Sequence, residues 1–119
     1  MHKFLLYASY GWLLLGSLLH FSIDVLSQYW RGERTAGVDT TLYFGLHSAY
    51  TLGQLLFAVV ALLLIRNGVP FFGERPGLIL GFTAAAAWLA VCVAFISYRE
   101  PRIVVGLFAI LLAGAALAR

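Results

Sequence analysis

Residues 42–65, LYFGLHSAYTLGQLLFAVVALLLI, contain no Asp, Glu, Lys or Arg. A helix needs about 20 apolar residues to cross the roughly 30 Å hydrocarbon core of a bilayer, so this stretch is long enough to span one. Three further apolar stretches lie at residues 4–26, 78–98 and 103–118. The sequence therefore predicts an all-α integral membrane protein, in which residues 1–119 form a single bundle of four transmembrane helices.

The composition supports this prediction. Of the 119 residues, 62% are hydrophobic and only 11% are charged, which lies outside the usual range of a soluble domain. In lipid the backbone must satisfy its own hydrogen bonds, and the apolar stretches lack the period-two alternation of a barrel strand, so helices are expected. The fourth stretch is short, and the long side chains of Arg102 and Arg119 can extend to the interfaces at its two ends.

The charged residues gather in the short connections and form no run of the kind that a nucleic-acid site requires, so no nucleic-acid partner is expected. With four spans, both termini share one side of the membrane. The basic residues then divide evenly, with Lys3, Arg66, Arg75 and Arg119 opposite Arg31, Arg34, Arg99 and Arg102. Four of the five carboxylates lie on the side away from the termini, and this distribution favours cytoplasmic termini.

Polar residues form a stripe on each of the first two spans. Gly16, His20 and Asp24 follow at intervals of four, and His47 lies on the second span, so that His20 and His47 are similarly far from the connection between the spans. Residues four apart share a helix face, and antiparallel neighbours meet at equal depth, so the two histidines are predicted to meet. Ionisable groups within a bilayer cost about 2.5–3.5 kcal/mol on insertion scales and are functional candidates. We predict a catalytic site at His20, Asp24 and His47.

Other polar and aromatic residues, some at the same end of the bundle and some deeper in the spans, are candidates for substrate binding. They are Tyr43, Tyr50, Gln54, Trp88, Tyr98, Arg99 and Glu100. Tyr50 and Gln54 are also typical of groups that hydrogen-bond one helix to another. Small residues at intervals of four on the last span, such as Ala109 with Ala113, allow close helix packing or the docking of a second copy as a homodimer.

Three short stretches carry a resemblance to a known family. "LLHFSID" ends the first span, "LSQYWRGE" follows it, and "AFISYRE" closes the third span. This order resembles the EXPERA family of four-span membrane proteins, which includes sterol Δ8–Δ7 isomerases and sterol-binding relatives. The resemblance implies that His20 and Asp24 shuttle a proton. His47 stands roughly where those isomerases have an acid on the second span.

Several functions are compatible with these residues. The first is a membrane-embedded acid–base enzyme without a cofactor, acting on an isoprenoid, sterol-like or other lipidic substrate among the membrane lipids. The second is a binding subunit in which His20 and His47 hold haem b or, together with Asp24, a divalent metal. The third is a small transporter or accessory protein, in which Asp24 binds a proton or the polar stripe only packs.

Overall fold

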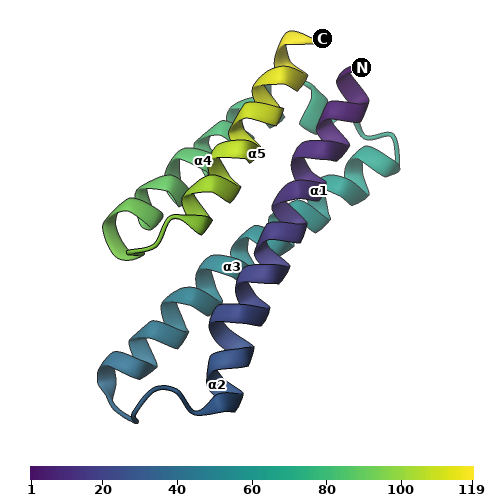
Figure 1. Cartoon of the computed structure of the whole chain (residues 1–119). Helices are drawn as coiled ribbons and strands as arrows, with labels where there is room; N and C mark the ends of the chain where they lie inside the picture. Colours follow the sequence, from purple (N-terminus) through teal and green to yellow (C-terminus); the bar gives the residue numbers. More distant parts are fainter.

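A computed structural model describes all 119 residues, Met1–Arg119, and contains helices but no strands (Figure 1). The elements are α1 (His2–His20), the π-helix η1 (Phe21–Ser27), α2 (Gln28–Arg31), α3 (Val38–Arg66), the 3-10 helix η2 (Pro70–Gly73), α4 (Arg75–Phe95) and α5 (Glu100–Leu117). The first three elements run on as one helical stretch, His2–Arg31. The chain thus has four helices that are long and apolar enough to cross a membrane, as predicted.

The helix boundaries differ from the apolar stretches in both directions. The first two helices continue into polar residues and end or begin several residues beyond the predicted limits, at Arg31 and Val38. α4 instead ends at Phe95, because the backbone at Ile96 is extended. Arg102 donates hydrogen bonds from Nη2 to the carbonyl oxygens of Cys92 and Ile96, at 3.4 and 2.9 Å, and so adds a second donor to Cys92, which also accepts from the Ile96 N–H, and supplies one to Ile96 beyond the end of α4.

Two helical hairpins of unequal length make up the bundle. At 1.5 Å per residue, His2–Arg31 and α3 are each about 45 Å long, whereas α4 and α5 are about 30 Å long. Both termini lie at the same end, and the α4–α5 hairpin covers only the part of the longer pair that is nearer to them (Figure 1). The rest of the longer pair extends beyond the α4–α5 hairpin. This uncovered part consists of the last residues of α1, all of η1 and α2, and the beginning of α3.

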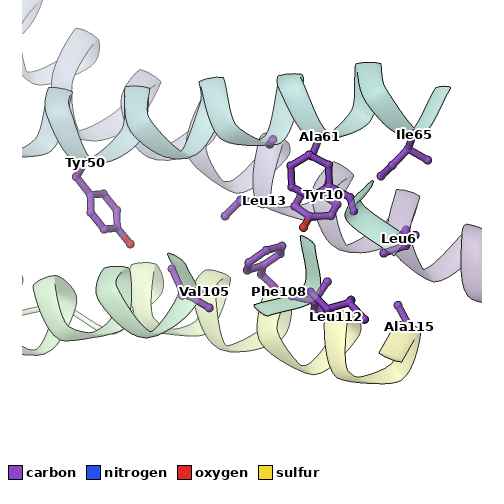
Figure 2. Close-up of a cluster of buried hydrophobic side chains, with 14 of the residues drawn as sticks. Leu6, Tyr10, Leu13, Tyr50, Ala61, Ile65, Val105, Phe108, Leu112 and Ala115 are labelled. Atoms are coloured by element: carbon purple, nitrogen blue, oxygen red, sulfur yellow. The ribbon is translucent and has the colours of Figure 1, made fainter. Parts of the chain in front are cut away.

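The buried core lies in the covered half. Tyr10, Leu13, Phe108 and Leu112 are fully buried there, and Figure 2 shows them between the two hairpins. The ring of Tyr10 meets Phe108 edge to face, with the ring centroids 5.4 Å apart. Large apolar side chains are also exposed along every long helix, on the surface that faces away from this core.

One glycine sets how closely α1 approaches α5. A Cβ added at Gly16 would overlap the side chain of Val104, so the two helices could not pack at this distance with a larger residue there. One turn earlier, Trp12 donates a hydrogen bond from Nε1 to the carbonyl oxygen of Val104 at 3.0 Å. Both contacts lie at the border between the covered core and the open half of the longer hairpin.

Candidate functional site

His20 and Asp24 lie at the junction of α1 and the π-helix η1. The Nδ1 atom of His20 is 3.5 Å from Oδ2 of Asp24, and the two side chains are only 8% and 16% exposed. Short π-helical segments within longer helices are rare and frequently occur at functional sites. The two residues share one face, as their spacing in the sequence predicts.

The second histidine comes from α3. His47 Nδ1 and His20 Nε2 are 2.8 Å apart and form a hydrogen bond, with the two rings nearly parallel and their centroids separated by 5.1 Å. One of these two nitrogens must carry the hydrogen and the other must accept it. The structure therefore brings the two histidines together, as their equal depth predicts, and links Asp24, His20 and His47 in one chain.

Tyr98 closes the site from the α4–α5 connection. Its hydroxyl lies 3.5 Å from His20 Nε2 and 3.4 Å from His47 Nδ1, the two nitrogens that share the hydrogen bond. Burial raises the pKa of the Tyr98 hydroxyl, and the negative charge of Asp24 raises it further. The group therefore stays protonated at neutral pH and can donate a hydrogen bond to either histidine.

A pocket of about 1220 Å³ opens beside these residues, where the α4–α5 hairpin ends against the longer pair. Eight of the ten residues predicted from the sequence line it, namely His20, Asp24, Tyr43, His47, Tyr50, Gln54, Tyr98 and Glu100. Most of the remaining wall is apolar and includes Leu15, Leu19, Leu46 and Phe95. The pocket thus combines a polar chain with an apolar wall.

Two of the predicted residues do not belong to the pocket. Trp88 points into the core, where its ring meets Phe57 and Phe108 with centroid distances of 5.5 and 6.4 Å. Arg99 lies exposed in the connection, while its neighbour Glu100 reaches the pocket. These two residues were predicted from their positions along the spans. Such a position does not show on which side of a helix a side chain lies.

The mouth of the pocket holds two residues that the sequence analysis did not select. Arg34 donates a hydrogen bond from Nε to Oε1 of Gln28 at 3.1 Å, and Gln28 donates from Nε2 to the hydroxyl of Tyr43 at 3.1 Å. The Arg34 guanidinium also lies over the Tyr43 ring, 3.4 Å from its centroid. Gln28 could have been found, because it continues the four-residue interval of Gly16, His20 and Asp24. Arg34 follows no such interval.

The arrangement of these side chains bears on the haem and metal alternatives. No group of three His, Cys, Asp or Glu side chains is placed to hold a metal ion. Asp24 faces Nδ1 of His20 whereas His47 faces Nε2, so one ion could not contact all three residues without reorienting the ring. An axial histidine pair needs a porphyrin and its iron between the two rings, whereas here the two ring nitrogens lie 2.8 Å apart.

Comparison with protein-family models, with curated proteins and with solved structures finds no match for this chain. The chemistry of the site therefore carries the functional conclusion. A carboxylate, two linked imidazoles and a protonated phenol at the side of an apolar pocket can accept and return protons.

Proposed function

We propose that the chain is an integral membrane protein that crosses the bilayer four times, with its termini in the cytoplasm. Four long apolar helices and the exposed apolar side chains along them support this proposal. The basic residues divide evenly between the two ends, and the orientation rests on the carboxylates, four of the five of which lie at the end away from the termini.

We further propose that the protein is an acid–base enzyme of the isomerase type, acting on a lipidic substrate within the membrane. The observation that carries this proposal is the chain of Asp24, His20 and His47 beside an apolar pocket of about 1220 Å³. A buried structural pair needs no such opening, whereas a catalytic group must reach its substrate. The resemblance to the EXPERA family favours a sterol-like or isoprenoid substrate.

The linked side chains of Asp24, His20 and His47 can relay a proton in one direction and return it. With Asp24 ionised, His20 carries its hydrogen on Nδ1 and accepts a hydrogen bond at Nε2 from His47 Nδ1–H. This leaves a lone pair on His47 Nε2, which has no hydrogen-bond partner in the protein. A substrate C–H bond can give its proton to that nitrogen, and the hydrogens on His47 Nδ1 and His20 Nδ1 then shift along the chain until Asp24 is protonated.

An isomerisation balances without any co-reactant. The electron pair of the broken C–H bond forms the shifted double bond, and the pair of the old double bond takes a proton at a different carbon. The substrate thus loses one proton and gains one, and Asp24, His20 and His47 return to their starting protonation states. Tyr98 is placed to stabilise either arrangement of the two histidines, because its hydroxyl is near both nitrogens.

Exchange of substrate hydrogen with solvent tests this function. The protein in proteoliposomes is incubated in D₂O with a panel of isoprenoid and sterol lipids, and deuterium uptake is followed by mass spectrometry. General acid–base groups contribute about 10²- to 10⁴-fold, so Asp24→Asn and His20→Ala should lower the exchange rate by that factor. Asp39→Asn and His2→Ala are matched controls, since neither residue lines the pocket, and both should keep the wild-type rate.

Wild-type exchange rates in both Asp24→Asn and His20→Ala would rule out the proposed mechanism. The absence of exchange with every lipid, together with proton-coupled uptake of a solute that is lost in Asp24→Asn, would instead favour the transporter hypothesis.

A further inference from the structure

Gln54 is a buried polar residue in the wall of the pocket that the proposed relay does not use. It lies on α3, is only 1% exposed and lines the same pocket as the histidines. Its side-chain Nε2 has no hydrogen-bond partner. An unpaired buried donor is expensive, and native structures contain few of them.

The polar side chains nearest to Gln54 along α3 already have partners. The Tyr50 hydroxyl, one turn away, lies 2.8 Å from Cys92 Sγ and is hydrogen-bonded to it. The Thr51 hydroxyl donates to the carbonyl oxygen of His47 at 2.7 Å, within its own helix. Neither hydroxyl forms a hydrogen bond of good geometry with Gln54 Nε2, so a ligand that enters the pocket can supply the acceptor.

The position of Gln54 relative to His47 sets the length of such a ligand. The two residues are seven positions apart on α3, which is nearly two turns, so they share a face at a separation of about 10 Å. The pocket wall between and around them is largely apolar. The polar side chains of His47 and Gln54 therefore lie at two separate positions along one side of the pocket.

We propose that Gln54 binds an oxygen of the substrate, so that the substrate is a lipid with a hydroxyl or carbonyl group about 10 Å from the carbon on which the histidines act. This inference rests on the proposed function and narrows its substrate class. A plain hydrocarbon tail would leave the Gln54 amide unpaired. A hydroxyl or carbonyl oxygen at that place satisfies it, and an apolar stretch between this oxygen and the reacting carbon fits the wall.

Nuclear magnetic resonance can observe this contact directly, because the chain contains only two glutamines, Gln28 and Gln54. The protein, labelled with ¹⁵N at glutamine and histidine side chains, is titrated in nanodiscs with 1,8-octanediol and separately with octane. The diol is symmetric, so its orientation does not matter, and its two oxygens span a distance similar to that between His47 and Gln54. Gln54→Leu assigns the Gln54 amide signals.

We expect the diol to shift the Gln54 amide signals and the His20 and His47 signals, and octane, which has no oxygen, to leave the Gln54 amide signals unchanged. The diol should bind wild type about three- to tenfold more tightly than it binds Gln54→Leu, whereas octane should bind both equally. Comparing one probe between two proteins removes the effect of its partition into lipid. Thr51→Val is the matched control, because it removes a buried polar group outside the pocket, and it should bind both probes like wild type.

Gln54 signals that stay fixed while the histidine signals move would overturn the inference and leave the proposed function standing. An equal response of Gln54 to both probes would also overturn it, since the oxygen would then make no difference. If neither the glutamine nor the histidine signals move with either probe, the pocket does not bind such molecules, and the proposed lipid substrate fails as well.

Discussion

The longer hairpin of this protein has two halves that differ in what covers them. In the half near the termini, α4 and α5 pack onto α1 and α3, and the contact surface is filled by Tyr10, Leu13 and Phe108. In the other half the shorter hairpin has already ended at Tyr98, and the same two helices present His20 and His47 to a pocket. The length of the α4–α5 hairpin thus decides where the packed core stops and where the candidate site begins.

The strongest challenge to this contrast is to remove one large side chain from each half. Phe108→Ala takes a fully buried ring from the core and should lower the free energy of unfolding by about 3–5 kcal/mol. Phe95→Ala removes a ring that lines the pocket and is 70% exposed, and it should cost less than about 1 kcal/mol. Unfolding by SDS in mixed micelles measures both. Equal losses would mean that the two halves are packed alike.

The border between the halves can be tested at Gly16. Gly16→Ala forces a Cβ against Val104 and should destabilise the fold by about 1–3 kcal/mol, because α5 must move away from α1. Val104→Ala in the same chain should restore most of the loss. Gly11→Ala is the control, since nothing lies within 4 Å of its added Cβ, and it should be neutral or stabilising. A loss at Gly11 as large as that at Gly16 would contradict the account.

A smaller effect is expected from the hydrogen bond that ties the same border together. Trp12→Phe keeps most of the ring but removes the donor to the carbonyl oxygen of Val104, and it should cost about 0.6 kcal/mol, the average for such bonds between membrane helices. The same unfolding titration measures the loss. No loss at all would show that Val104 is held by packing alone.

The smallest effect concerns Tyr98 and appears only at high pH. Below the ordinary tyrosine pKa of 10.0 both the folded and the unfolded chain keep this proton, so stability does not depend on it. Above that value the unfolded chain loses the proton first, because burial raises the pKa in the folded state, and stability falls as the pH rises. Wild type should lose stability more steeply above about pH 10 than Tyr98→Phe. Parallel curves would contradict the burial of this hydroxyl.

The sequence predicted the number of helices well, because the scarcity of charge over each long stretch is a strong signal. It also placed His20, Asp24 and His47 together, since the four-residue interval and the short connection fix their faces and depths. It could not predict the π-helix at Phe21–Ser27, for which those residues carry no recognisable signal. Nor could it show that Trp88 faces the core, because α4 is apolar on all sides and has no polar stripe to mark its orientation.

The part of the site that came from the loops was the hardest to predict. Arg34 reaches Tyr43 and Gln28 only because the chain turns at Gly32, where φ is +60°. Tyr98 reaches the histidines only because α4 ends early at Phe95 and the next residues are extended. Both placements depend on how a connection folds against other helices, and neither follows from periodicity.

The central claim is that His20 and His47, from different helices, share one hydrogen bond at the open end of the bundle. A ¹⁵N–¹⁵N correlation spectrum of the protein in lipid bilayers tests this most directly, with ¹⁵N in the histidine rings and His2→Ala removing the only other histidine. The account predicts a cross-peak between His20 Nε2 and His47 Nδ1, because these atoms are 2.8 Å apart. A spectrum in which neither ring correlates with the other would contradict it.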